Sequence, residues 1–291
     1  MSSLAFSAPS GGALVFAAKQ EPALVLQRLA ALPKLRGVTA ASRLEVRPMP
    51  EMVSSGIREI DELAGGLPRG CLSEICGPAS SGRTSVLLSA LAASTRRQEV
   101  CALVDVTDAL DTVSAAATGV ELERLLWIRC TQASDLRPPL FDLRSTSEVR
   151  RPRSEVRLEQ ALRVTDLLLQ SGGFGLVAID LGDVPDAAAR RIPLASWFRF
   201  QRAVEPTATV LLVVAQAPCA QTCASLLIRL QAGKKLSALS SQLSATTGLG
   251  PAHAQLLDGL QVEGELLRLR LQRKPAQSII TAFATKAVRI A

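Results

Sequence analysis

A stretch from Gly77 to Thr84 has the residue types and spacing of a phosphate-binding loop. It reads Gly-Pro-Ala-Ser-Ser-Gly-Arg-Thr, the pattern G-x-x-x-x-G-[K/R]-[ST], between a strand-like segment and a helix-like one. Gly77 and Gly82 let the backbone curl so that successive N–H groups and a helix N-terminus point at one spot, which favours phosphate oxygens. The expected nucleotide-binding residues of this loop are Gly77, Pro78, Ala79, Ser80, Ser81, Gly82, Arg83 and Thr84.

Arg83 departs from the usual pattern, which has a lysine at this position. Arginine keeps the positive charge but is bulkier, planar and differently hydrated, so the exchange is not conservative where a compact ammonium reaches the terminal phosphates. Thr84 would still offer its hydroxyl to a magnesium ion. We therefore expect a loop that can bind a nucleotide but does not catalyse well.

Two polar residues end apolar, strand-like segments further along the chain. Asp180 follows Leu-Val-Ala-Ile, and Gln216 follows Val-Leu-Leu-Val-Val-Ala. In an open α/β sheet the carboxyl ends of the strands form the ligand-binding edge, so both side chains are expected beside the phosphate loop. Asp180 is interpreted as a magnesium ligand, and the alternative is an aspartate that only caps a strand end.

Apolar strand-like segments alternate with helical ones from about residue 56 to residue 230. The expected strands are 71–76, 100–106, 126–130, 174–181 and 209–216, and the expected helices are 80–95, 159–171 and 196–204. This alternation predicts an α/β fold with a mostly parallel central sheet covered by helices on both faces. Segments 226–230 and 256–271 are expected to form later strands or a hairpin at the sheet edge.

The sequence divides into three regions. Residues 1–50 are expected to contain a helix over 22–32 and a linker, and that helix could pack on its own domain or on a partner. Residues 51–232 form the expected core. An exposed basic insertion at 131–157 is either a solvated loop or a salt-sensitive contact to phosphates. Residues 233–291 are expected to hold a surface helix, edge strands and a tail.

Composition excludes several other kinds of chemistry. With 48% apolar and 20% charged residues, the 291-residue chain is expected to be a folded cytoplasmic protein without a membrane span or a cleaved secretory signal. His253 is the only histidine, so neither a histidine-rich metal site nor a Ser-His-Asp triad is expected. The six cysteines include no C-x-x-C pair and are expected to be buried free thiols. A net charge of +7 permits a polyanionic partner without requiring one.

From about residue 56 to residue 230 the sequence resembles the RecA recombinase family. Ordered blocks carry the resemblance: GGLPRG at 65–70, EICGPASSGRT at 74–84, CALVDVTDALD at 101–111, EQAL at 159–162, then Asp180 and Gln216. The resemblance implies ATP and magnesium as cofactors and filaments on single-stranded DNA. It further implies Asp111 near the adenine, Asp180 at the magnesium ion and Gln216 as the sensor of the terminal phosphate.

Three departures from the RecA pattern bear on activity. Where that family has a glutamate that activates the attacking water, this chain has Thr107, which cannot act as a general base near neutral pH. Asp108 could substitute only if the loop shifted its register. Arg83 replaces the lysine, and the segment after Gln216 is too short for the family's long glycine-rich DNA-binding loop. No intact set of catalytic residues is therefore expected.

These losses resemble the RecA-related mutagenesis accessory proteins of the ImuA-like group and their relatives, the SulA-like cell-division inhibitors. The stretches at 180–185, 190–194 and 197–202 also look like the ImuA-like group. They supply candidate contacts for DNA or a protein partner: Arg190, Arg191, Trp197, Arg199 and Arg202. The alternative is an amphipathic helix with its aromatic rings partly in the core and its arginines in solvent.

The resemblance implies a nucleoid-associated accessory role in the SOS response and in translesion DNA synthesis. The implied partners are an ImuB-like polymerase subunit, a replicative-type error-prone polymerase, RecA recombinase and single-stranded DNA, with no membrane partner. One alternative is a divergent DNA-dependent ATPase that uses Arg83 and Asp108. A SulA-like division inhibitor is the other, and the intact Gly77 and Gly82 argue against it because that family lacks an intact phosphate loop. ATP binding and self-association stay open.

Overall fold

The computed structural model describes residues 49–130, 153–233, 259–270 and 279–286. The chain divides into two units, Met1–Pro48 and Met49–Ala291, and every described residue belongs to the second. The helix expected over 22–32, His253, residues 131–152 of the insertion and most of the surface segment after residue 233 lie outside the described residues.

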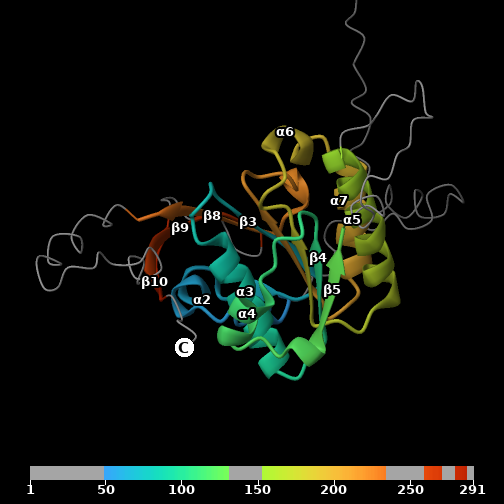
Figure 1. The fold of residues 1–291 in the computed structure, drawn as a ribbon. Helices are drawn as coiled ribbons and strands as arrows, with labels where there is room; N and C mark the ends of the chain where they lie inside the picture. Colours follow the sequence, from blue (N-terminus) through green and yellow to red (C-terminus); the bar gives the residue numbers. More distant parts are fainter. Residues whose placement is uncertain (1–48, 131–152, 234–258, 271–278, 287–291) are drawn as a thin grey trace, which may run out of the picture. The chain divides into compact units, whose positions relative to one another are not determined.

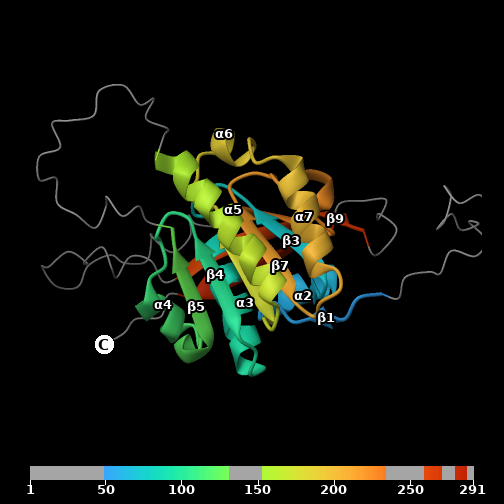
Figure 2. The same cartoon turned by 90° about the vertical axis from the view of Figure 1, so that its right-hand side faces the viewer.

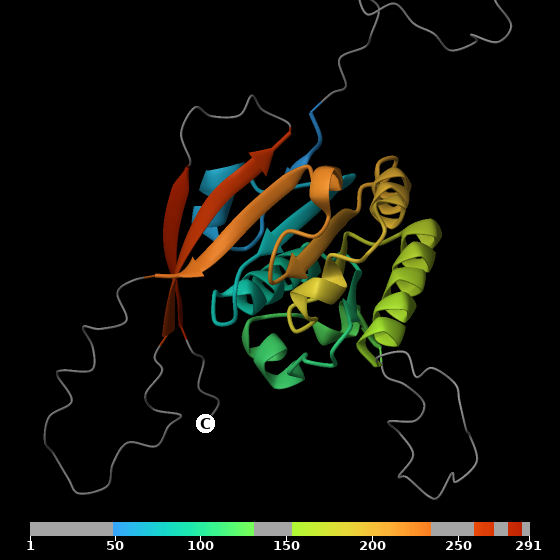
Figure 3. The ribbon, with the colours of Figure 1, turned by 90° about the horizontal axis from the view of Figure 1, so that it is seen from above.

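An eight-stranded sheet runs through the described residues in the order β10-β9-β8-β3-β7-β6-β4-β5. Its strands are β3 (Cys71–Cys76), β4 (Cys101–Asp105), β5 (Leu125–Arg129), β6 (Leu176–Asp180), β7 (Val210–Ala215), β8 (Leu226–Ala232), β9 (Gly259–Leu269) and β10 (Ile280–Lys286). All neighbours from β8 to β5 are parallel, whereas β9 and β10 pair antiparallel beyond β8. Figure 3 shows these two strands at the edge of the sheet remote from α5. The predicted mostly parallel sheet is confirmed, and the segments expected at 226–230 and 256–271 form the later strands β8 and β9 on the β10 side of the sheet.

Helices cover both faces of this sheet (Figures 1 and 2). On one face lie α2 (Arg58–Ala64), α3 (Arg83–Arg96) and α4 (Thr112–Ala117), and on the other lie α5 (Arg153–Ser171), α6 (Asp186–Ala189) and α7 (Leu194–Val204). Strand β7 shows why its sequence is apolar throughout: Leu212 and Val214 pack with α2 and α3, while Leu211 and Val213 pack with α5 and α7. Among the described residues, no helix combines the length and apolarity needed to cross a membrane.

The smaller elements connect these layers. A two-stranded sheet of β1 (Met52–Val53) and β2 (Leu67–Pro68) precedes β3, and two short 3-10 helices, η3 (Leu122–Arg124) and η5 (Gln221–Cys223), precede β5 and β8. The six cysteines are all free, and all but Cys71 are buried. Burial raises the pKa of Cys76 and of Cys101 to about 12, so these thiols behave as small apolar side chains.

Helix α5 begins earlier than its sequence pattern indicated. The insertion was expected to extend to residue 157, with a helix from 159, but α5 starts at Arg153. Leu158 and Ala161 of this helix are buried against the sheet, while charged residues such as Glu159 and Arg163 lie on its outer side. The end of the insertion therefore belongs to the first turns of an amphipathic helix, whose solvent-facing charges hid the helical period.

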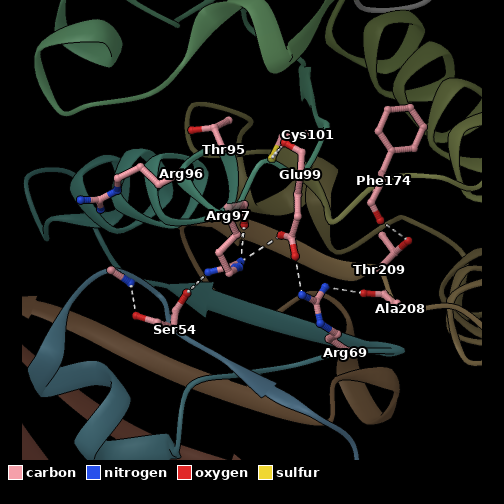
Figure 4. A network of polar contacts seen from close by, with 12 residues as sticks. Ser54, Arg69, Thr95, Arg96, Arg97, Glu99, Cys101, Phe174, Ala208 and Thr209 are labelled. Atoms are coloured by element: carbon pink, nitrogen blue, oxygen red, sulfur yellow. Dashed lines mark hydrogen bonds and ion pairs between the residues drawn. The ribbon is translucent and has the colours of Figure 1, made fainter.

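Three charged side chains tie the starts of strands β3, β4 and β7 together (Figure 4). Arg69, which follows β2, and Arg97, which follows α3, both donate to the carboxylate of Glu99 just before β4; the Arg97 Nη2 to Glu99 Oε2 distance is 3.1 Å. Arg69 Nη1 also donates to the Ala208 carbonyl oxygen at 2.7 Å. The Glu99 side chain is 19% exposed, so water screens these contacts only in part.

Replacing Glu99 with Gln should destabilise the fold in a pH-dependent way. Burial alone would raise the pKa of Glu99, but the hydrogen bonds from Arg69 and Arg97 outweigh it and lower the pKa. A lowered carboxyl pKa contributes stability that is complete above the ordinary value of 4.5 and is lost as the pH falls through the folded-state pKa. Urea unfolding near neutral pH should show a loss of about 1–2 kcal/mol for Glu99→Gln, and this difference should shrink in acid.

Glu62→Gln, at an exposed pair with Arg58, should change stability by less than about 0.5 kcal/mol. Equal losses at both pH values would contradict this account.

Candidate functional site

The phosphate loop lies between β3 and α3, where two glycines have no room for a side chain. Gly82 precedes the first residue of α3 with a φ of 86°, in the left-handed region, and a Cβ there would lie 2.6 Å from Val262 Cγ2 of β9. A Cβ on Gly77 would lie 2.4 Å from the Leu230 carbonyl oxygen of β8. The later strands β8 and β9 therefore pack directly against the loop and require both glycines.

The loop offers polar groups that suit an anion. Helix α3 is 14 residues long and has no side-chain cap at its N-terminus, so its first N–H groups have no side-chain acceptor. Ser81 is 1% exposed, and its Oγ has no hydrogen-bond partner among the described residues. An unpartnered buried hydroxyl beside an uncapped helix N-terminus fits a phosphate group at this position.

A cavity of about 160 Å³ adjoins the start of α3 and brings together four of the expected site residues. Arg83 and Thr84 line it from α3, Asp111 from the start of α4, and Asp180 from the end of β6. Ser114 and Asp183 add polar side chains to the lining, and Gly182 with leucine, alanine and valine residues forms the rest. The other loop residues, from Gly77 to Gly82, do not line this cavity.

Arg83 and Gln216 meet at one backbone carbonyl. Arg83 Nη1 donates to the Gly182 oxygen at 3.0 Å, and Gln216 Nε2 donates to the same oxygen at 3.0 Å. The Gly182 N–H in turn donates to Asp180 Oδ1 at 2.8 Å. We call these four residues, Arg83, Asp180, Gly182 and Gln216, the Gly182 cluster. Sequence reasoning missed Gly182, although its place two residues after Asp180 was a signal: a Cβ there would lie 2.9 Å from Asp180 Oδ1.

Asp180 has an environment that favours its protonated form. Burial, helped by the carboxylates of Asp105 and Asp183, raises the pKa of Asp180 to about 6, against the Gly182 hydrogen bond and the charge of Arg83. Asp105 and Asp180 are register partners on the neighbouring strands β4 and β6. A cation or an additional hydrogen-bond donor at this position would therefore favour the ionised form of Asp180.

Magnesium fits this corner in the way that nucleotide sites hold it. Thr84 and Asp180 line the same cavity, and a hydroxyl and one carboxylate would leave the remaining positions of the ion to water and phosphate oxygens. Among the described residues no group of three or more His, Cys, Asp or Glu side chains is arranged to hold a metal without a nucleotide. Thr84 and Asp180 are thus the residues that would hold the ion, and it would supply charge neutralisation to bound phosphates.

Comparison with known proteins finds similarity to RecA proteins. Residues 29–135 match the family model described as the RecA N-terminal domain. A RecA protein of Kineococcus radiotolerans is 35% identical over 156 residues, which cover 52% of this chain and 38% of that protein. RecA proteins of Ectopseudomonas oleovorans and Brucella canis are each 35% identical over 132 residues, or 45% of this chain.

These matches support the assignment of this chain to a RecA-like family. The matched part of this chain spans between 30% and 38% of the length of these relatives. The sheet of mostly parallel strands with helices on both faces is consistent with a RecA-like α/β core.

The position of the water-activating acid in the RecA pattern has no free carboxylate in this structure. Thr107 Oγ1 is buried and has no hydrogen-bond partner among the described residues. Asp108 pairs both of its oxygens with Arg129 of β5, with Nε and Nη2 each at 2.6 Å. The hydrogen bonds from Arg129 lower the pKa of Asp108, which weakens it as a proton acceptor.

Two further acids hold backbone segments around the site. Asp105 is fully buried, and its carboxylate accepts from the Ala109 and Leu110 N–H groups at 3.1 and 2.9 Å and from Trp127 Nε1 at 3.2 Å. Asp111, expected near an adenine, caps α4 by accepting from the Val113 and Ser114 N–H groups. Its carboxylate lines the cavity while fixing the first turn of that helix.

The connection after Gln216 is short, and a buried side chain of the central strand β3 accepts hydrogen bonds from its backbone. Only η5 lies between Gln216 and the start of β8 at Leu226. The fully buried Glu74 of β3 accepts from the Cys219 N–H at 2.5 Å and the Ala220 N–H at 3.2 Å. Burial raises the pKa of Glu74, and these two hydrogen bonds act against that shift. Sequence reasoning did not find this role of Glu74.

The candidate contact surface on α6 and α7 requires a correction. Trp197 is 0% exposed and packs edge-to-face on Phe200, with ring centroids 5.9 Å apart, so it belongs to the core and cannot contact a partner. Its place on α7 turns it toward the sheet, as in the amphipathic alternative. The arginines are on the surface, and three of them are paired: Arg190 with Asp186, Arg191 with Glu155, and Arg199 with Asp166. Arg202 is exposed.

Asp180→Asn should stabilise the protein at neutral pH in magnesium-free buffer. Because the folded-state pKa of about 6 lies above the ordinary 3.8, the contribution of Asp180 to stability is most favourable below the ordinary value and falls as the pH rises through 6. Asparagine keeps an oxygen acceptor for the Gly182 N–H but carries no charge. Urea unfolding at about pH 7.5 should show a gain of about 1–3 kcal/mol, which disappears near pH 4. The exposed control Glu123→Gln should change little at either pH, and a loss of stability in Asp180→Asn at neutral pH would refute the assignment.

Proposed function

We propose that this chain is a RecA-like accessory protein of DNA-damage tolerance that binds a nucleotide and acts through protein contacts, with weak or absent ATP hydrolysis. The pairing of Asp108 with Arg129 carries the proposal, because it leaves the water-activating position with Thr107 alone. Nucleotide binding is supported by the uncapped start of α3, the buried Ser81 hydroxyl and the shared cavity of Thr84 and Asp180.

The translesion role rests on the resemblance to the ImuA-like group. Its partners would be an ImuB-like polymerase subunit and a replicative-type error-prone polymerase, or RecA recombinase, in the nucleoid during the SOS response. Two features of the described residues agree with protein contacts rather than a grip on single-stranded DNA. The connection from Gln216 to β8 is short, and Arg190, Arg191 and Arg199 each have an acidic partner.

ATP turnover separates this proposal from a DNA-dependent ATPase. In the wild-type chain, phosphate release with Mg-ATP should be near background and should not increase when single-stranded DNA is added. The double variant Arg83→Lys with Thr107→Glu should raise turnover at least about tenfold, since a positioned general base is worth roughly 100-fold or more. DNA-stimulated hydrolysis in the wild type that is lost in Asp180→Ala would instead establish the ATPase alternative.

Nucleotide binding needs its own measurement and a matched pair of variants. Thr84→Ala removes the expected magnesium hydroxyl and should weaken Mg-ATP binding about tenfold or more in a calorimetric titration. Ser85→Ala removes the adjacent hydroxyl, which does not line the cavity, and should bind as the wild type does. Equal affinity in both variants, or no binding by the wild type, would overturn the nucleotide-binding part.

The accessory role predicts a complex that does not need hydrolysis. Purified chain mixed with the ImuB-like polymerase subunit should elute as one complex in size-exclusion chromatography, and the Asp180→Asn variant should form it equally well. Absence of that complex, together with filamentous cell growth on overexpression, would favour the division-inhibitor alternative.

A further inference from the structure

We infer that Arg83 controls the segment from Gly182 to Pro193: with the phosphate loop empty it restrains this segment, and an anion in the loop releases it. This inference rests on the proposed phosphate binding by residues 77–84. It adds a regulated surface to that site, on the opposite face of the sheet from α3.

The restraint is built from three elements that meet at one peptide group. Arg83 reaches the Gly182 oxygen from the first turn of α3, Gln216 reaches the same oxygen from the end of β7, and Asp180 accepts the Gly182 N–H at the end of β6. Arg83 is 9% exposed, so its guanidinium makes this contact largely out of water. Both polar groups of the Gly182 backbone are thereby held.

A bound anion would offer Arg83 stronger hydrogen bonds than the Gly182 carbonyl does. A guanidinium carries five N–H donors in a planar fork, and Gly182 offers it a single neutral carbonyl. A phosphate beside the α3 N-terminus would offer paired, charge-assisted hydrogen bonds, which are stronger than a bond to a carbonyl. This difference in interaction strength between the empty and the occupied loop is what a ligand needs to shift a conformational equilibrium.

The restrained segment forms one wall of a groove on the face of the sheet opposite α3. After Gly182 the chain enters α6 and runs to Pro193, next to α5 and α7 (Figure 2). Ala188, Arg191 and Ile192 line a groove of about 590 Å³ between this segment and α5. The segment is fastened there by the buried Val184, Ala189 and Ile192 and by the Arg191–Glu155 ion pair at 3.3 Å. Loss of the Gly182 restraint would therefore loosen a wall of this groove.

Hydrogen exchange of the full chain tests the restraint without any ligand. In Arg83→Gln the peptide spanning residues 182–193 should exchange about tenfold faster than in the wild type, as expected for loss of a hydrogen bond to a charged group. Gln216→Ala, which leaves the phosphate loop intact and lies at an exposed residue, should increase exchange in the same peptide. Arg96→Gln, on the last turn of the same helix, is the matched control and should change nothing there. Unchanged exchange in both the Arg83 and the Gln216 variants would overturn the restraint.

Pyrophosphate with magnesium then tests the release. The anion should speed exchange of the 182–193 peptide in the wild type about tenfold and should give no further increase in Arg83→Gln. Calorimetry on the same samples separates the outcomes. Binding of pyrophosphate without faster exchange would overturn the release while leaving the proposed phosphate site intact. No binding would overturn both the phosphate site and the release, and the ligand-free variants would still decide whether the restraint exists.

Discussion

Parallel pairing of the inner strands is the constraint on which this molecule depends. Because β3, β7, β6 and β4 run in one direction with the registers Cys76↔Ala215, Asp180↔Val214 and Asp105↔Asp180, the residues at their carboxyl ends meet along one edge of the sheet. Backbone groups inside these strands pair with the neighbouring strands, so polar groups are most readily available at the edge. The phosphate loop, Asp180 and Gln216 are neighbours for this reason.

Packing of late strands against an early loop gives that edge its shape. Val262 of β9 and the Leu230 carbonyl of β8 lie against Gly82 and Gly77, where no side chain could fit. The antiparallel strands β9 and β10 thus belong to the same core as the phosphate loop, with Val262, Leu266 and Phe283 buried in it. A substitution that moves Val262 would therefore alter the packing of the loop that precedes α3.

Charged side chains around the site mostly hold backbone groups or each other. Asp105, Asp111 and Glu74 accept from main-chain N–H groups, Asp108 is occupied by Arg129, and Arg83 donates to a main-chain carbonyl. Such groups are expensive to bury unless hydrogen-bonded, and here the bonds stabilise connections between strands.

The sequence by itself determined the strands from β3 to β9, the three longest helices (α3, α5 and α7) and the phosphate loop, because apolar runs and glycine spacing act within a few residues of the chain. It also indicated that Thr84, Asp180 and Gln216 lie at one edge, and the resemblance to RecA added Asp111. Only the tertiary structure decided what these groups touch. Arg83 and Gly182 are 99 residues apart, Glu74 and Cys219 are 145 apart, and Asp108, which follows β4, is 21 residues from Arg129 of β5. The burial of Trp197 was decided in the same way, since only the packing of α7 on the sheet determines whether an aromatic side chain on that helix faces the core or the solvent. Hydrogen bonds and burial between distant segments depend on how the helices pack on the sheet, and the local periodicity of the sequence does not specify that packing.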